Sequence, residues 1–341
     1  MDDFADFLNG LPHPALLIGP DARVLRANLA AEALFGQGLV GRHQAFVLRR
    51  PEPLAAIEAA LNGQASTARL VIPGPGPEAV WQMSAWPVGQ VGGAQGAACL
   101  FEDQTRAEQA EQMRRDFVAN VSHELKTPLT ALLGFIETLQ GPARGDAAAR
   151  DRFLGIMARE ADRMNRLVRD LLHLSRVESQ ERQRPDGRID LAALARSVAA
   201  TLRPTADRAG VTLEATGLDA EFLVRADADQ MTQVLTNLIE NAVKYGASGG
   251  MARVSLTRES GPRGPLARLM VEDRGEGIEP QHLPRLSERF YRVDGHRSRE
   301  KGGTGLGLAI VKHIAQRHRG RLVIESEPGN GARFSVLLPL D

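Results

Sequence analysis

The sequence predicts a multidomain α+β protein. Its 341 residues are enough for two or three domains with separate cores. Two long helical patterns occupy the middle of the chain, and short strand patterns lie before and after them. We therefore expect an N-terminal antiparallel α/β domain over residues 1–104, an antiparallel helical hairpin over 105–180 and a C-terminal α/β sandwich over 188–341.

Composition and charge exclude several classes of protein. The chain is 43% hydrophobic and 25% charged, as expected of a globular protein. Lys plus Arg and Asp plus Glu both number 42, so charge gives no reason to expect nucleic acid as a partner. The single cysteine, Cys99, excludes an intramolecular disulfide and fits a reducing compartment. Residues 1–3 are unlike a signal peptide and no apolar run approaches the ~18 residues of a membrane span, so we expect a cytoplasmic protein without a transmembrane segment.

The N-terminal domain reads as short strands joined by turns. Five short apolar segments are expected to form strands: residues 15–18, 23–27, 68–72, 80–86 and 97–103. Asn28 is the expected cap of a helix over 29–35, and the Gly/Pro-rich residues 73–77 are an expected loop. This order is similar to that of a PAS domain. Such a domain senses a ligand or serves only in dimerisation, and the sequence leaves both alternatives open.

The first long helical pattern carries a histidine on its polar side. A polar run without Gly or Pro, residues 104–116, leads into apolar residues that recur at steps of three and four. At 3.6 residues per turn, His123 and Thr127 share a face that points away from this apolar stripe. Pro128 is expected to bend the helix, and residues 141–146 are expected to end it.

The second long helical pattern repeats apolar residues at steps of four and three over residues 153–174, interrupted by Glu160. Two amphipathic helices joined by a short turn form an αα-hairpin with an exposed apolar face. Because a hairpin alone cannot cover this face, we expect two chains to pair into a dimeric four-helix bundle.

Residues 122–128, Ser-His-Glu-Leu-Lys-Thr-Pro, resemble the phosphoacceptor box of the sensor histidine kinases of two-component systems. The resemblance covers about residues 105–341, and the order of the three parts is similar to that of the phosphate-regulon sensors. It implies that His123 accepts a phosphoryl group, that Glu124 takes or polarises the imidazole proton, and that Thr127 orients water in a phosphatase reaction. A histidine without these neighbours would be read as a solvated surface residue.

A polar stripe marks the helix expected over residues 230–245. Asn237, Asn241 and Lys244 fall within about 60° of one another, away from its apolar face. Amide oxygens suit Mg²⁺ and an ammonium suits phosphate, whereas the same stripe taken alone is a solvated face. The stripe resembles the family's asparagine box, which implies that Asn241 is the Mg²⁺ ligand. The nucleotide contacts that it implies are Asn237, Lys244 and Tyr245.

Three later segments extend the resemblance. Asp273 ends an apolar strand before a Gly-x-Gly turn, so its carboxylate can accept a hydrogen bond from adenine while the glycines let the ring approach; ordinary tight turns use the same residues. Residues 288–294 resemble the phenylalanine box, with Arg292 placed to reach the γ-phosphate, and residues 295–302 read as a mobile lid. A glycine-rich segment then opens a helix, whose N-terminus attracts phosphate. The nucleotide-binding residues implied across these segments are Asp273, Gly275, Gly277, Ile278, Arg292, Gly303, Thr304, Gly305, Leu306, Gly307 and Leu308.

The resemblance implies a homodimeric protein-histidine kinase. It would bind ATP and Mg²⁺ in a sandwich of the histidine kinase and Hsp90-like ATPase type, phosphorylate His123, and pass the phosphoryl group to an aspartate on the receiver domain of a response regulator. The residues expected to carry catalysis are His123, Glu124, Thr127, Asn241 and Arg292. The chain has no P-loop motif, and its glycine-rich segment lacks the third glycine and the preceding strand of a dinucleotide-binding fold. Two alternatives remain open: a conformational ATPase like Hsp90 or MutL, and a non-catalytic dimeric scaffold.

Overall fold

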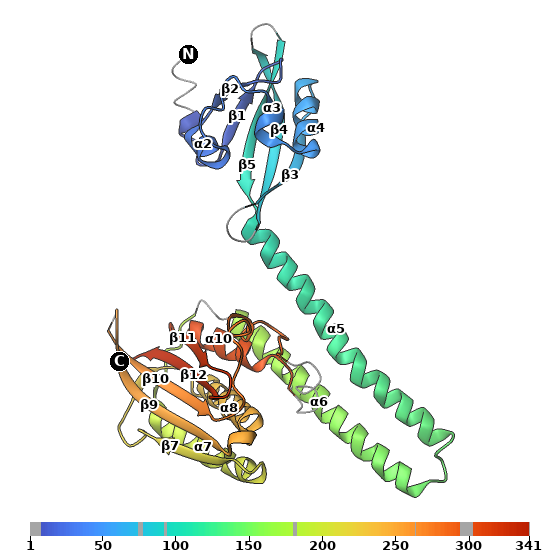
Figure 1. Cartoon of the computed structure of the whole chain (residues 1–341), viewed down its shortest axis with the longest axis vertical. Helices are drawn as coiled ribbons and strands as arrows, with labels where there is room; N and C mark the ends of the chain where they lie inside the picture. The colour runs from blue at the N-terminus through green and yellow to red at the C-terminus, as the bar shows by residue number, and fades with distance from the viewer. Residues whose placement is uncertain are drawn as a thin grey trace. The chain divides into compact units, whose positions relative to one another are not determined.

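The computed structural model describes residues 8–73, 78–91, 94–179, 183–262, 264–293 and 303–340. The chain separates into two compact units, Met1–Ala119 and Asn120–Asp341, and the boundary falls inside helix α5 (Thr105–Gln140; Figure 1). None of the described helices combines the length and the apolar character needed to cross a membrane.

The first unit is built on a five-stranded antiparallel sheet with the strand order β2-β1-β5-β4-β3. Its strands are β1 (Ala15–Ile18), β2 (Val24–Ala27), β3 (Ser66–Ile72), β4 (Ala79–Val91) and β5 (Ala94–Asp103). Its helices are α2 (Leu29–Phe35), α3 (Gln44–Leu48) and α4 (Pro51–Leu61). All five expected strands are present, and β4 and β5 are longer than expected because they pair with each other along a hairpin. Of the expected loop, residues 74–77 lie outside the described part of the chain.

Asn28 is the cap that the sequence predicts for α2, and it does more than cap the helix. Its side chain is 1% exposed, and Oδ1 accepts hydrogen bonds from the N–H groups of Ala31 and Ala15, both at 2.9 Å. Its Nδ2 donates to the carbonyl oxygens of Leu8 at 3.1 Å and His13 at 2.8 Å. One buried amide therefore ties the start of α2 to the start of β1 and to the chain before it.

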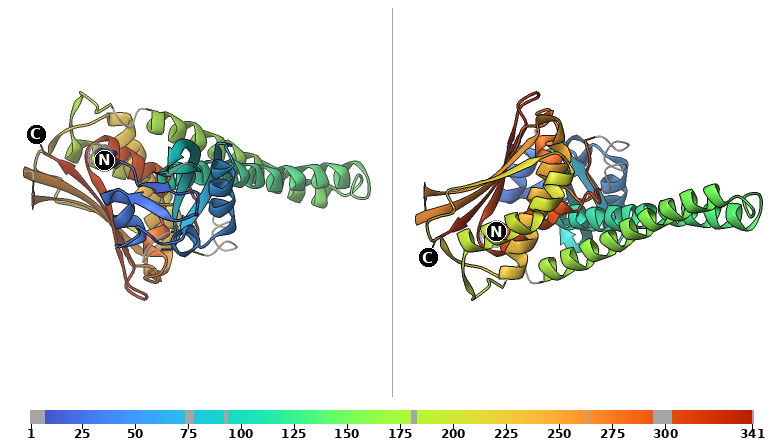
Figure 2. Two further views of the ribbon diagram at one scale, coloured as in Figure 1. Left: turned by 90° about the horizontal axis from the view of Figure 1, so that it is seen from above. Right: turned by 90° about the horizontal axis from the view of Figure 1, so that it is seen from below.

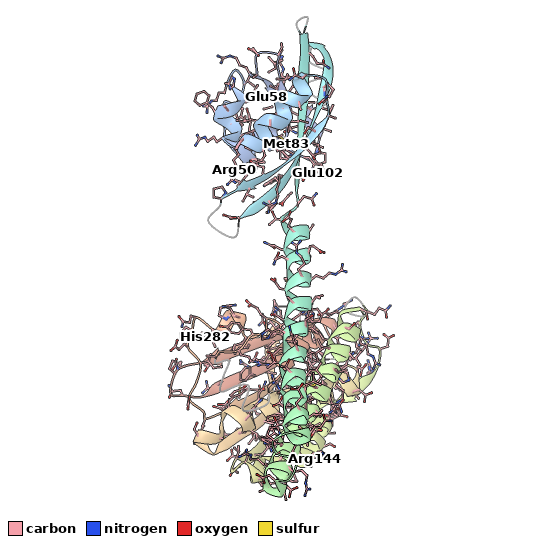
Figure 3. All side chains as sticks on the ribbon, turned by 90° about the vertical axis from the view of Figure 1, so that its right-hand side faces the viewer. Arg50, Glu58, Met83, Glu102, Arg144 and His282 are labelled. Carbon is pink, nitrogen blue, oxygen red and sulfur yellow. The ribbon has the colours of Figure 1, made fainter. Side chains whose placement is uncertain are left out.

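The core of the first unit contains the side chains that the sheet turns toward α2 and α4. Met83, labelled in Figure 3, and Phe101 are fully buried, and the Phe101 ring meets that of Phe35 edge-on at 4.9 Å. Cys99 is buried as well, and burial raises the pKa of its thiol to about 12. The cysteine is therefore a core residue with little thiolate character.

Helix α5 and helix α6 (Ala147–Ser179) form the expected antiparallel hairpin. The rings of Phe135 and Phe153 stack across it at 5.2 Å. Pro128 lies inside α5 and does not end it, since the helix continues to Gln140. Large apolar side chains remain exposed along the hairpin in this single chain: Leu129, Leu133, Ile136, Leu154, Val168 and Leu172.

The rest of the second unit is an α/β sandwich. Its mixed sheet has the order β11-β12-β10-β9-β7, in which β7 and β9 are parallel. Its strands are β7 (Thr212–Thr216), β9 (Met251–Gly261), β10 (Gly264–Asp273), β11 (Arg321–Ser326) and β12 (Ala332–Pro339). A small sheet pairs β6 (Arg188–Asp190) with β8 (Leu223–Arg225). Helices α7 (Leu191–Arg208), α8 (Ala228–Tyr245) and α10 (Gly307–Arg317) cover one face of the large sheet (Figure 2).

The two faces of this sheet differ because side chains alternate along each strand. On β10, Leu269 and Val271 are fully buried on the helix side. Arg268, on the other side, reaches Glu259 of β9 at 2.7 Å and Glu325 of β11 at 2.8 Å. Ion pairs thus cross the strands on the face that the helices leave open, while the apolar core holds α8 and α10 against the other face.

A buried histidine joins the start of α8 to the end of α10. The backbone N–H of Asp227, the cap of α8, donates to Nε2 of His318 at 3.1 Å. Nε2 therefore carries no proton, and Nδ1–H donates to the carbonyl oxygen of Ile314 at 2.7 Å. Burial lowers the pKa of His318, in keeping with a neutral ring.

Candidate functional site

The candidate phosphoacceptor lies on the open side of α5. His123 is exposed, as the helical period predicts, and so is Thr127. The Thr127 hydroxyl donates a hydrogen bond to the backbone carbonyl of His123 at 3.1 Å. The imidazole and the hydroxyl therefore share an accessible face, one turn apart.

Glu124, the residue after His123, is half-buried and contacts other parts of the second unit. Its Oε2 accepts a hydrogen bond from Nη2 of Arg163, on α6, at 2.8 Å. The same oxygen lies 3.2 Å from Nη2 of Arg292. The two residues that the sequence singled out as base and γ-phosphate ligand, Glu124 and Arg292, are thus an ion pair, and Arg163 is a third member that the sequence did not indicate.

Helix α8 displays the expected polar stripe beside a buried apolar face. The residues expected on its apolar face are all buried: Met231, Val234, Leu235, Leu238 and Ala242.

Asn237, on the polar stripe, donates from Nδ2 to the carbonyl oxygen of Gly307 at 3.2 Å and accepts from Gln233 at 3.0 Å. Asn241 is half-buried one turn further along, and the Lys244 ammonium lies 5.5 Å from the centre of the Tyr245 ring. The polar stripe of α8 therefore contacts the first residue of α10 through Asn237 and extends to Lys244 at the end of α8.

Asp273 lies at the end of β10 with 4% of its surface exposed. Burial raises the pKa of its carboxyl, and Oδ1 accepts a hydrogen bond from the N–H of Gly275 at 2.8 Å. A Cβ on Gly275 would overlap the carbonyl oxygen of Tyr245, and one on Gly277, whose φ is +73°, would overlap that of Glu327. The sequence attributes these glycines to close approach of a ligand; the structure shows that packing within the chain already requires both.

The glycine-rich segment joins the phenylalanine box at the start of α10. The backbone N–H of Phe290 donates to the carbonyl oxygen of Gly305 at 2.8 Å, and both residues have positive φ, +64° and +74°. The Thr304 hydroxyl donates to Asp170 of α6 at 2.7 Å and accepts from the N–H of Leu306 at 3.3 Å. Of the remaining predicted residues, Gly303 precedes Thr304, and Gly307 and Leu308 begin α10. The N–H of Ile278 donates to the hydroxyl of Ser326, at the end of β11, at 2.9 Å, and among the described residues no hydrogen bond joins Ile278 to the glycine-rich segment. The lid expected over residues 295–302 lies outside the described residues.

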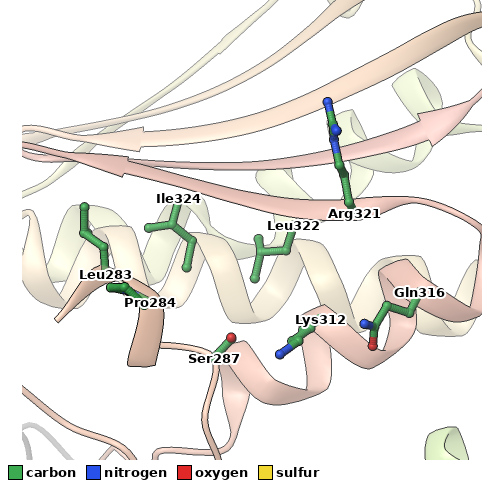
Figure 4. A pocket seen from close by; sticks show the side chains of 8 residues that line it. All are labelled: Leu283, Pro284, Ser287, Lys312, Gln316, Arg321, Leu322 and Ile324. Atoms are coloured by element: carbon green, nitrogen blue, oxygen red, sulfur yellow. The ribbon is translucent and has the colours of Figure 1, made fainter. Parts of the chain in front are cut away.

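A groove of about 360 Å³ lies elsewhere on the sandwich, between α10, the edge strand β11 and the residues around Leu283 (Figure 4). Lys312, Arg321, Leu322 and Ile324 are among the residues that line it. The predicted site residues do not line this groove, so the nucleotide hypothesis draws no support from it.

Comparison with known families assigns all three parts of the chain. Residues 8–109 match the PAS fold, residues 113–180 match the His Kinase A (phospho-acceptor) domain, and residues 226–341 match the histidine kinase-, DNA gyrase B- and HSP90-like ATPase. The fold and the site thus define a class of protein, in which a sensor-type domain and a phosphoacceptor hairpin precede an ATPase domain.

Individual relatives give the family within that class. The phosphate regulon sensor protein PhoR of Pseudomonas aeruginosa is 42% identical over 237 residues, which are 69% of this chain and 52% of the relative. The sensor histidine kinase WalK of Bacillus subtilis is 37% identical over 244 residues, 72% of this chain and 39% of the relative. The chain therefore spans about half the length of these relatives or less, and it belongs to the sensor histidine kinases of two-component systems.

A solved structure shares the fold over nearly the whole chain. The histidine kinase ThkA in its complex with the response regulator protein TrrA covers 98% of both chains at 20% identity, with a TM-score of 0.51. The expected fold class, multidomain α+β with a helical hairpin and an ATPase-type sandwich, is confirmed.

Proposed function

We propose that this chain is an ATP-dependent protein kinase that phosphorylates its own His123. The observation that carries the proposal is the exposure of His123 on a phosphoacceptor hairpin whose neighbouring residue, Glu124, contacts the ATPase domain through Arg292. We assign residues 1–104 to sensing, 105–180 to dimerisation and phosphotransfer, and 188–341 to ATP binding and catalysis.

Asp273 and the start of α10 are the proposed anchors for the nucleotide. A buried carboxylate that accepts backbone hydrogen bonds from Gly275 and Ala332 still has lone pairs left for the amino group of adenine. Backbone N–H groups of residues 303–308 would receive the phosphates at a helix N-terminus. Lys244 and Arg292 would supply positive charge near the transferred group.

Mg²⁺ fits this site as an ion held jointly by protein and nucleotide. Among the described residues, no group of three or more His, Cys, Asp or Glu side chains gathers to hold a metal by itself. Mg²⁺ commonly uses one or two protein oxygens and fills its shell with phosphate and water, so the amide oxygen of Asn241 is a sufficient protein ligand. The ion would neutralise phosphate charge there.

Phosphoryl transfer at this site requires mainly positioning and charge neutralisation. A ring nitrogen of His123 forms a bond to the γ-phosphorus while the bond from that phosphorus to the β,γ-bridging oxygen breaks, and ADP leaves with the electron pair. The proton on the other ring nitrogen passes to the Glu124 carboxylate. The products are phosphohistidine and ADP.

The proposed partners are a second copy of this chain and a response regulator. The exposed apolar side chains of the hairpin support pairing of two hairpins in a four-helix bundle. An exposed His123 supports transfer of the phosphoryl group to a receiver-domain aspartate. Thr127, on the same face, supports a second activity in which its hydroxyl orients water against the phosphoaspartate.

Incubation of the full chain with γ-labelled ATP and Mg²⁺ tests the proposal. We expect a label that is stable in alkali and labile in acid, that is lost in His123→Gln and that is kept in the matched variant His13→Gln, which changes an exposed histidine of the first unit. Release of phosphate without labelled protein would instead favour a conformational ATPase. Absence of nucleotide binding would favour a scaffold.

A further inference from the structure

The groove between α10 and β11 lies at an open edge of the large sheet. Within the described residues, β11 comes first in the sheet order and pairs only with β12. An edge strand presents backbone N–H and C=O groups on its open side, and an added strand can pair with them. The groove of about 360 Å³ lies beside this edge, with α10 along its other side (Figure 4).

The apolar lining of the groove has the spacing that suits an extended peptide. Leu322 and Ile324 are two residues apart on β11, so they share one face of the strand, and both side chains point toward α10 (Figure 4). Leu283, in the short 3₁₀ helix Leu283–Arg285, lies at the Ile324 end of the groove. All three side chains are only half-buried, so part of their apolar surface is open to a ligand.

The polar lining of the same groove is cationic. Lys312 of α10 and Arg321, the first residue of β11, line the groove and are exposed. Among the described residues, no carboxylate forms an ion pair with either side chain, and no Asp or Glu lines the groove. Carboxylates on a partner would therefore complement the charge of the groove.

The open backbone edge, the apolar lining and the two cations together favour one kind of occupant. A small apolar ligand would leave the backbone edge and both cations unused, and a free anion would leave the apolar lining unused. An extended peptide that adds to a sheet edge gains affinity from backbone hydrogen bonds and specificity from alternate side chains. With acidic residues beside the apolar ones, such a peptide uses all three features.

We propose that β11 and α10 bind an extended acidic segment of a partner protein. The backbone of the segment pairs with the open edge of β11, and an apolar side chain packs against Leu322 and Ile324. Its carboxylates pair with Lys312 and Arg321. This docking requires no phosphorylation of His123, so it goes beyond the proposed function.

The proposed docking groove adjoins two parts of the ATPase domain that lead into the proposed nucleotide site. Helix α10 begins at the glycine-rich segment, and Ser287, which lines the groove, directly precedes the phenylalanine box. A partner bound in the groove would therefore contact both segments.

Selection of random peptides displayed on phage, with the full chain immobilised, supplies the probe. We expect enrichment of peptides that carry apolar residues at alternate positions with Asp or Glu beside them. The enriched peptide, labelled with a fluorophore, is then titrated with the full chain. Lys312→Glu should raise its Kd by about tenfold, because a favourable charge pair is replaced by repulsion.

Arg203→Glu is the matched control, since it reverses an exposed cation of α7, the helix that packs against β7 at the opposite edge of the sheet. This variant should leave the Kd of the peptide unchanged. Equal Kd values for Lys312→Glu and the unaltered chain would overturn the proposal.

Backbone pairing is tested on the peptide, so the protein stays unaltered and misfolding cannot produce the result. An added strand turns alternate N–H groups toward its neighbour, so N-methylation of one alternating set should raise the Kd by about tenfold or more, and N-methylation of the other set should not raise it. Equal effects of the two sets would show attraction without strand addition and would overturn the proposal. Failure to enrich any peptide would also overturn it, and self-association that Lys312→Glu abolishes would then assign the groove to a second copy of the chain.

Discussion

The side-chain amide of Asn237 donates a hydrogen bond to the backbone carbonyl of Gly307, 70 residues further along the chain, at 3.2 Å. This bond fixes the first residue of α10 against α8, so the N-terminus of α10, the proposed phosphate site, is held by the same polar stripe that carries Asn241. Asn237 therefore supports the proposed nucleotide site through Gly307, in addition to its proposed contact with the nucleotide.

Replacing Asn237 by Ala should weaken nucleotide binding because the start of α10 loses its anchor. Loss of one hydrogen bond of this kind costs about 1 kcal/mol, so we expect about a fivefold increase in the Kd of a non-hydrolysable ATP analogue, measured by calorimetry. The control is Thr232→Ala on the same helix, whose hydroxyl bonds to the carbonyl of Ala228 one turn back. Equal affinities for Asn237→Ala and the unaltered chain would contradict the role of the bond.

Replacing Asp273 by Asn should impair recognition of adenine. The substitution keeps the shape of the side chain and removes a charged acceptor, which is worth about 2 kcal/mol and so tenfold or more in Kd for the ATP analogue. Glu272→Gln, on the opposite face of the same strand, is the matched control because its carboxylate pairs with Arg253 and Arg333. A Kd that moves equally in both variants would show a general effect on the sheet.

The stability of the α8–α10 connection should fall as the pH is lowered. Burial lowers the pKa of His318 below its ordinary value of 6.5, so the unfolded chain binds a proton that the folded chain does not. Stability from this group is fully present above pH 6.5 and is lost as the pH falls below that value toward the folded-state pKa. Hydrogen exchange of α8 and α10 peptides between pH 7.5 and about 5 should show this, after correction for the intrinsic pH dependence of exchange.

His318→Gln should flatten that pH response, since glutamine does not titrate. His13→Gln, which removes an exposed histidine from the first unit, should leave the response intact. Persistence of the full pH response in His318→Gln would assign it to another group.

Replacing Asn28 by Ala should destabilise the first unit by roughly 3 kcal/mol, because four backbone groups lose their buried partner. Both tryptophans of the chain, Trp81 and Trp86, lie on β4, so denaturant unfolding followed by tryptophan fluorescence reports on this unit selectively. Asn9→Ala is the control, since the Asn9 side chain accepts an exposed hydrogen bond from Leu29. Midpoints that shift equally for the two variants would argue against the buried network.

Replacing Thr127 by Ala should separate the two activities assigned to the hairpin. Autophosphorylation of His123 should persist, because the Thr127 hydroxyl bonds within its own helix. Dephosphorylation of a phosphorylated receiver domain should be lost, since no hydroxyl remains to orient water. Thr130→Ala, at an exposed position nearby, should affect neither reaction. Equal loss of both activities in Thr127→Ala would refute a separate phosphatase role.

The sequence predicts best those features that arise from local periodicity. The apolar face of α8 and the cap at Asn28 follow from helical spacing and from short-range hydrogen bonding, and both are present. Helices α3 and α4 were not anticipated, and the lengths of β4 and β5 were underestimated, because a strand's extent depends on the partner with which it pairs.

Contacts between distant parts of the chain could not be predicted from the sequence. Glu124 and Arg292 each carried a predicted role, yet nothing local indicates that residues 168 positions apart would meet. Arg163 carried no motif at all, and its pairing with Glu124 follows from the way in which α5 and α6 pack. The sequence identifies Gly275 and Gly277 beside Asp273 but explains them only by the approach of a ligand. The close backbone packing that also requires glycine at both positions is visible only in three dimensions.

The burial of Cys99 has a practical consequence. With its thiol in the core and a pKa of about 12, the chain's single cysteine should resist maleimide and methanethiosulfonate reagents while the protein stays folded. A cysteine introduced on α6 and another on α10 would then be the only sites to take a spin label or a fluorophore. Spectroscopic distances between introduced cysteines could therefore be measured without first replacing Cys99.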